Sequence, residues 1–189
     1  MSHNRRDSVN TQVTKRKLPM KINSSLLSHM LGVAALLGVA SFLPLSAATL
    51  GFNQNQFTLT VPDDWTTQQT DGNQIGAQNG DGESLAMFTG PVDDVGPITG
   101  DSPYVRNLVT TLQEDGGTKI LGGHTETING APYYILFLTH PRNDGVMNSM
   151  VFLTVASGQI YQVVFGVMKG DPNKNIDYRA IINSFSVQR

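Results

Sequence analysis

The sequence predicts an α+β fold, specifically a three-layer α/β/α sandwich around a mainly antiparallel sheet. Three stretches in the second half of the chain, 133–139, 151–155 and 160–167, are apolar on both faces when read as strands. Two-residue turns at Asn129-Gly130 and Ser157-Gly158 connect neighbouring strands, which makes those strands antiparallel. Because antiparallel sheets usually leave one face to water, strands that are apolar on both faces require helices over both faces of the sheet.

The chain begins with a predicted signal peptide, residues 1–48. Its centre, residues 30–43, is an uncharged apolar run too short to cross a bilayer comfortably as a permanent helix. Small residues at Ser46 and Ala48 suit signal peptidase, so we expect cleavage after Ala48. The leader before the apolar run is long, and Met20 is an alternative start. We therefore expect a bacterial protein that is periplasmic or secreted and has no permanent transmembrane anchor.

The predicted mature part, residues 49–189, has the size of one domain. The chain contains no cysteine, which excludes disulfides, thiol catalysis and a lipid anchor on an N-terminal cysteine. Seven of the 13 Lys and Arg residues and 14 of the 15 acidic residues follow Ala48, which leaves a formal charge of −7. The basic residues are scattered, so neither nucleic acid nor an anionic membrane surface is an expected partner.

The first half of the mature part is predicted to contain two strands and a polar segment. Residues 57–61 alternate as a short strand that stops at Pro62, and Trp65 then returns to the core. Residues 72–82 are rich in Gly, Asn, Gln and Asp, which is typical of a loop or a loose hairpin. Residues 85–88 are the next strand.

Two helices are predicted, each opened by a proline in its first turn. Asp101-Ser102-Pro103 opens the first helix with a capping side chain. Gly116-Gly117 ends it, and its apolar face follows the helical period through Tyr104, Val105, Leu108, Val109 and Leu112. Asp171-Pro172 opens the second helix, whose buried stripe is predicted to consist of Ile176, Ala180, Ile181 and Phe185.

Between these helices the chain is predicted to be mostly sheet. Two short extended runs, 119–121 and 125–128, come first. Asn129-Gly130 then provides the strongest two-residue hairpin signal in the chain, because both residues readily adopt positive φ. Asn129 and Gly130 are therefore assigned a structural role.

The segment from His140 to Gly145 gathers more polar groups than any other connection between core strands. A histidine near an arginine and an aspartate can bind an anion or transfer a proton. The alternative is a plain hairpin loop, with Pro at an early position and Asn-Asp-Gly completing the turn. The candidates for contact with a partner or ligand are His140, Arg142, Asn143 and Asp144.

No catalytic set is predicted. The sequence around Ser84, GESLA, mimics a nucleophile elbow, but that motif needs a strand before the serine and a helix after it. Here a glycine-rich loop precedes Ser84 and a strand is predicted to follow it.

No metal site or cofactor is predicted either. His124 and Glu126 would lie on the same face of a strand, yet two ligands do not make a zinc site. Asp71 and Asn73 match part of a calcium-binding loop, but Gly82 stands where a bidentate carboxylate is needed.

The order of these features resembles the PsbP-like superfamily. The features are a strand ending in Pro62-x-x-Trp65, a mid-chain amphipathic helix, the Asn129-Gly130 hairpin leading into residues 131–167, and a final helix ending in IINSF at 181–185. That superfamily includes the PsbP subunit of photosystem II, the Ran-binding nuclear import factor, and the exported bacterial proteins DcrB and LpqN. The resemblance implies that Pro62 to Trp65 form the corner after the first strand and that Trp65 plugs the core.

The resemblance also implies a function. The implied function is that of an exported, non-catalytic accessory protein, which binds another envelope or secreted protein. The chain departs from the lipoprotein members in lacking a cysteine at the cleavage site, and its export signal excludes Ran as a partner. Two alternatives stay open: a carrier for a small apolar ligand or lipid held between sheet and helix, and, more remotely, a serine hydrolase acting through Ser84.

Overall fold

A computed structural model of the chain describes residues 49–52, 57–70, 74–92, 96–114, 116–175 and 178–187. The predicted signal peptide lies outside these residues and stays a prediction. Within the described residues, every helix is too short or too polar to span a membrane.

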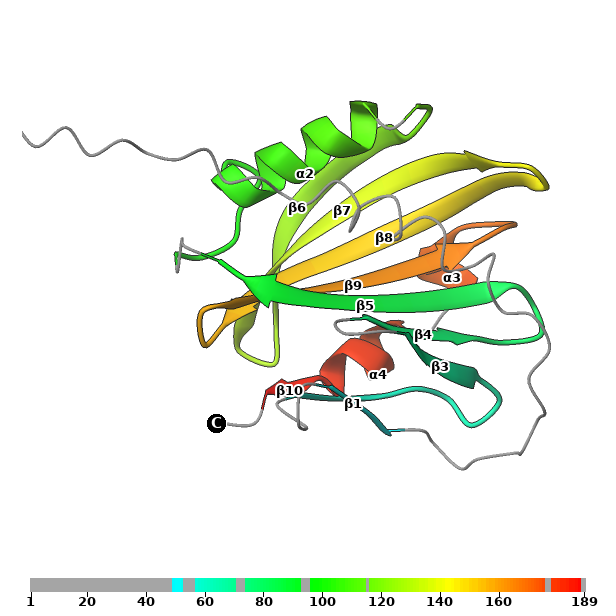
Figure 1. The fold of residues 1–189 in the computed structure, drawn as a ribbon, viewed down its shortest axis with the longest axis horizontal. Coiled ribbons are helices and arrows are strands. Elements are labelled where there is room, and N and C mark those ends of the chain that lie inside the picture. The colour runs from blue at the N-terminus through cyan, green and yellow to red at the C-terminus, as the bar shows by residue number, and fades with distance from the viewer. Residues whose placement is uncertain are drawn as a thin grey trace, which may run out of the picture.

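A seven-stranded antiparallel sheet forms the centre of the fold (Figure 1). Its strands, in spatial order, are β3 (Thr66–Thr70), β4 (Gln74–Gln78), β5 (Glu83–Pro91), β9 (Gln159–Val167), β8 (Gly145–Ala156), β7 (Ala131–Arg142) and β6 (Lys119–Ile128). Every neighbouring pair in this order is antiparallel. The predicted α+β class with a mainly antiparallel sheet is confirmed.

The remaining elements pack on the two faces of this sheet. A second, three-stranded sheet consists of β1 (Thr49–Phe52), β2 (Phe57–Thr60) and β10 (Ser186–Val187). The helices are α2 (Pro103–Glu114), α3 (Pro172–Asn175) and α4 (Tyr178–Asn183). Figure 1 shows α2 on one side of the large sheet, and the small sheet with α4 on the other.

The large sheet separates two apolar cores, because alternate residues of each strand point to opposite faces. On one face, Leu108 and Leu112 of α2 pack in a cluster with Leu136 and Leu153. The other face carries a larger cluster that includes Phe57 and Leu59 of β2, Ile181 and Ile182 of α4, and Phe152 at its centre. The predicted α/β/α layering is not shown, since a small sheet shares this second face with α4.

The corner after β2 brings the only tryptophan of the chain into the larger core. The backbone N–H of Trp65 donates to the carbonyl of Pro62 at 3.1 Å, which closes a turn through two exposed aspartates. The Trp65 side chain is 7% exposed and belongs to the cluster around Phe152.

The two expected hairpin turns have the geometry that their residues favour. Asn129 and Gly130 have φ of 51° and 76°, and Ser157 and Gly158 have φ of 51° and 71°. Positive φ at both central residues defines the type I′ turn, whose twist matches that of paired strands. Asn129 also donates from Nδ2 to the carbonyl of Asn183 at 2.9 Å, which links this hairpin to the end of α4.

Three local predictions need correction. The polar segment 72–82 contains strand β4, because pairing with β3 and β5 outweighs its low strand propensity. The runs 119–121 and 125–128 belong to the single strand β6, whose register shifts between Ile120 and Gly122.

The third correction concerns the C-terminal helix. It consists of two short helices, α3 and α4, instead of one. In α4 the buried residues are Ile181 and Ile182, while Ala180 is exposed and Phe185 follows the helix. Ile176 lies outside the described residues.

Candidate functional site

The segment with the predicted binding residues is mostly strand. Strands β7 and β8 pair as far as Arg142 and Gly145, so only Asn143 and Asp144 form the turn. The expectation of a six-residue loop is therefore wrong, because two residues suffice to reverse the chain between antiparallel strands. His140 and Arg142 lie within β7.

His140 is held in place by the connection between α2 and β6. Its Nδ1 lies 2.9 Å from the hydroxyl Oγ1 of Thr118, which is buried. Close to this contact, a Cβ atom on Gly117 would lie only 2.7 Å from Cγ of Pro141, so the Pro141 ring packs directly on the backbone of Gly117. These contacts tie the end of the β7–β8 hairpin to the body of the protein.

The tip of the hairpin presents an exposed acidic and apolar surface. The side chain of Asp144 is 73% exposed, and its Oδ1 lies 4.0 Å from Nε of Arg142, whose side chain is 14% exposed. Asn143 is exposed as well. Val146, which follows the turn, is 52% exposed. We call Asn143, Asp144 and Val146 the hairpin tip.

Ser84 does not lie in a nucleophile elbow. It is the second residue of β5, a strand that continues to Pro91, whereas the elbow requires a helix directly after the serine. The hydroxyl of Ser84 donates to the carbonyl of Gly166 on the neighbouring strand β9 at 3.3 Å. This geometry is that of a strand serine bonded across the sheet.

His124 and Glu126 lie on one face of β6, as predicted, with Nε2 and Oε2 3.6 Å apart. Arg179 of α4 joins His124 and Glu126 in a cluster of three polar side chains, and it donates from Nη1 to Oε1 of Glu126 at 2.7 Å. The pKa of Arg179 is raised, and this hydrogen bond is the largest cause. The guanidinium also lies 5.4 Å from the ring centre of Tyr178, and His124 stacks on Phe137 with ring centres 5.8 Å apart.

Arg179 has no sequence signal that points to Glu126, since the two residues come from distant parts of the chain and meet only when α4 packs against the sheet. The cluster also does not make a metal site. Across the residues that the structure describes, no three potential His, Cys, Asp or Glu ligands come together.

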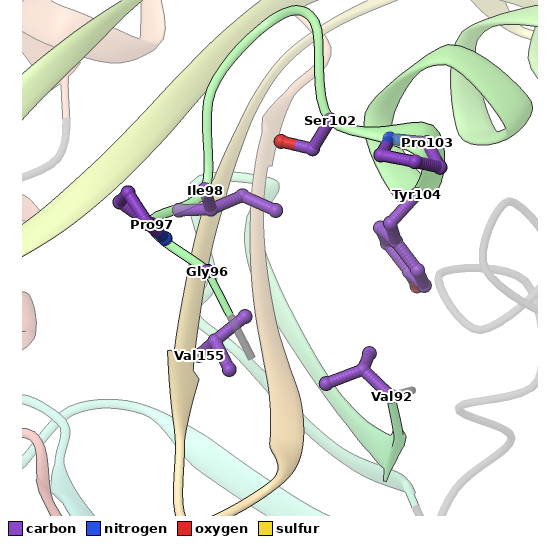
Figure 2. Close-up of a pocket in the computed structure, with 8 residues that line it drawn as sticks. All are labelled: Val92, Gly96, Pro97, Ile98, Ser102, Pro103, Tyr104 and Val155. Carbon is purple, nitrogen blue, oxygen red and sulfur yellow. The ribbon is translucent and has the colours of Figure 1, made fainter. Parts of the chain in front are cut away.

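A small recess lies between the start of α2 and the sheet (Figure 2). Its volume is about 30 Å³, which is roughly the space of one water molecule. The side chains of Ile98, Tyr104, Val92 and Val155 surround it. Beside it, Nε2 of the buried Gln162 donates to the hydroxyl of Tyr104 at 2.7 Å, and burial raises the pKa of this tyrosine.

Comparison with known proteins identifies the fold. No protein-family model and no curated protein matches the chain. Among solved structures, cyanobacterial PsbP (CyanoP) from Synechocystis matches with a TM-score of 0.57 and 14% identity, over 80% of this chain and 99% of that one.

Two further solved structures are similar. One is a protein of Bacteroides thetaiotaomicron, with a TM-score of 0.51 and 13% identity over 77% of this chain; the match spans half of that protein's length. The Ran-binding protein Mog1p of Saccharomyces cerevisiae has a TM-score of 0.48 and 13% identity, over 75% of this chain and 95% of that one. The chain has a PsbP-like fold, as the sequence pattern predicted.

Proposed function

We propose that this protein is an exported, non-catalytic accessory protein that acts by binding another protein of the cell envelope or a secreted protein. Residues 1–48 would direct export and be removed by cleavage near Ala48, and the PsbP-like fold would serve as a rigid support for a contact surface. The observation that carries the proposal is the hairpin tip, Asn143, Asp144 and Val146.

Two properties of the hairpin tip favour protein contact. First, it combines an exposed carboxylate and an exposed amide with an exposed valine, and interfaces typically surround apolar contacts with polar groups. Second, the contact of His140 with Thr118 anchors the strand that carries the tip. A surface that is already ordered loses less conformational entropy on binding than a flexible loop does.

The recess beside α2 does not support the alternative of a carrier for an apolar ligand or lipid. Sites that bury a drug-sized ligand have volumes of roughly 300–1,000 Å³. The recess beside α2 offers about 30 Å³. The hydrolase alternative would need Ser84 in a different setting from the strand position that it occupies.

Chemical crosslinking in the native envelope tests the proposal. The protein, expressed with its own signal peptide and an affinity tag, is crosslinked in cells and recovered together with bound proteins. We expect one reproducible protein partner, with crosslinks that map to the hairpin tip.

Charge reversal at the tip provides the variant. Asp144→Arg should reduce recovery of the partner several-fold, because a reversed charge opposes the potential of a complementary surface. Asp101→Arg is the matched control, since Asp101 is also exposed, carries the same charge and precedes α2, away from the tip. Absence of a reproducible partner, or equal recovery with both variants, would contradict the proposal.

A further inference from the structure

Strand β6 leaves one side of the large sheet open. Among the strands that the structure describes, it stands at the end of the order and pairs with β7 alone (Figure 1). It is ten residues long, whereas β3 at the opposite edge has five. Residues 121–125 and Thr127 of β6 are exposed. An edge strand of this kind carries N–H and C=O groups that can pair with a further strand.

Most features that discourage edge pairing lie at the beginning of β6; the exception is the charged Glu126, which accepts a hydrogen bond from Arg179. Lys119 and the register shift after Ile120 are such features, and both precede Gly122. From Gly122 to Ile128 the strand pairs with β7 in unbroken register and contains no proline. The strand edge at residues 123–127 therefore lies in unbroken register, between Gly122 with a φ of 144° and the buried Ile128.

We propose that a second copy of this chain pairs antiparallel with residues 122–128 about a two-fold axis at Thr125. In this register, His124 of each copy lies opposite Glu126 of the other copy. Thr125 of one copy lies opposite Thr125 of the other. Threonine pairs are favourable across antiparallel strands, and the Glu126 carboxylate can accept a hydrogen bond from the imidazole of the histidine opposite. The segment is thus complementary to itself, which a two-fold interface requires.

The side chains of β6 are compatible with this pairing. Glu126 is already oriented by Arg179 at 2.7 Å and lies 3.6 Å from His124 of its own strand, so the carboxylate stands on the face where the second histidine would arrive. Gly122 and Gly123 would face Ile128 and Thr127 of the second copy. A Cβ atom at Gly122 would meet no atom within 4 Å, so this position is open, whereas the Tyr134 side chain already covers Gly123.

The surface involved is separate from the hairpin tip, so this inference does not rest on the proposed binding of another protein. Sedimentation velocity of the purified protein, secreted with its own signal peptide, measures its mass directly. We expect a dimer that dissociates on dilution. Thr125→Lys should weaken the dimer at least tenfold, because it places two like charges across the axis.

A single engineered cysteine tests the register, since the chain has none of its own. With Thr125→Cys, the two Cβ atoms would lie about 4.5–5.5 Å apart across the axis, close enough for a disulfide after small adjustment. Thr127→Cys is the matched control, because Thr127 is exposed on the same strand face but would lie opposite Gly123.

We expect Thr125→Cys to form a disulfide-linked dimer under mild oxidation many times faster than Thr127→Cys, with unchanged circular dichroism in both variants. A protein that stays monomeric at every concentration would overturn the proposal. Equal crosslinking of the two cysteine variants, or faster crosslinking at position 127, would overturn it as well.

Discussion

Single glycine residues show how tightly the sheet is packed. A Cβ atom at Gly123 would lie 2.5 Å from the hydroxyl oxygen of Tyr134 and 2.8 Å from the backbone carbonyl of Ile135. A Cβ atom at Gly166 would lie 2.9 Å from Sδ of Met147. The two positions differ in kind, because a methionine thioether can move aside whereas a backbone carbonyl in a sheet cannot.

We therefore predict that Gly123→Ala lowers the free energy of unfolding by about 2–3 kcal/mol, as overpacking against fixed atoms does. Gly166→Ala should lower it by about 1 kcal/mol or less, since Met147 can change rotamer. Urea denaturation of both variants measures the difference. A smaller loss at Gly123 than at Gly166 would contradict this assignment.

The predicted site residues His140 and Asp144 differ in the contacts of their side chains. Sequence patterning placed a chain reversal between His140 and Gly145, because turn residues are recognisable locally, and the structure has its turn at Asn143 and Asp144. Sequence patterning could not assign separate roles to His140 and Asp144. His140 contacts Thr118, which comes from a different element, whereas Asp144 points to solvent. The difference arises from packing between elements that lie far apart in the sequence.

At the scale of elements, the two type I′ turns provide an internal comparison. Asn129 and Ser157 occupy equivalent positions, each with φ of 51°. Asparagine adopts this left-handed conformation more readily than serine does. The β8–β9 turn is thus built from a less favourable residue than the β6–β7 turn.

Exchange of the two residues should have opposite effects. Ser157→Asn should raise the free energy of unfolding by roughly 0.5–1 kcal/mol, and Asn129→Ser should lower it by at least as much. The second variant also loses the hydrogen bond from Asn129 to Asn183. Thermal unfolding of both variants measures the effects, and a loss of stability in Ser157→Asn would refute the argument.

The helices illustrate where element prediction succeeds. The helix α2 follows its apolar period and has Val105, Leu108 and Leu112 buried. The C-terminal segment is harder, since α4 packs against β2, which lies far away in the sequence. There, the hydroxyl of Ser184 accepts a hydrogen bond from the N–H of Thr60 at 2.8 Å, directly after α4. The sequence around Ser184 contains no pattern that predicts Thr60 as its hydrogen-bond partner.

At the scale of the whole molecule, buried tyrosines couple folding to alkaline pH. Burial raises the pKa of Tyr133 from its ordinary 10.0 to about 12, and it also raises the pKa of Tyr104 and Tyr161. The folded protein therefore holds these protons more tightly than the unfolded chain does. The resulting stability is complete below pH 10 and is lost as the pH rises toward 12.

We predict that the protein unfolds cooperatively in this alkaline range. Tyrosinate absorbance should then rise together with the loss of circular dichroism. Tyr133→Phe should reduce the pH dependence, because it removes one of the groups whose pKa is raised. Full tyrosine ionisation near pH 10 with native circular dichroism would contradict the prediction.

Local sequence accounts for β2, β5, β7, β8 and β9, the turns at Asn129-Gly130 and Ser157-Gly158, the amphipathic helix α2 and the antiparallel α+β class. These features follow from residue periodicity and turn chemistry, which act between neighbours along the chain. The small sheet over the second face, the contact of Arg179 with Glu126 and the open edge at β6 arise only when distant segments pack together. Their physical basis is the burial of apolar surface and the pairing of polar groups between elements, and no window of sequence contains both partners.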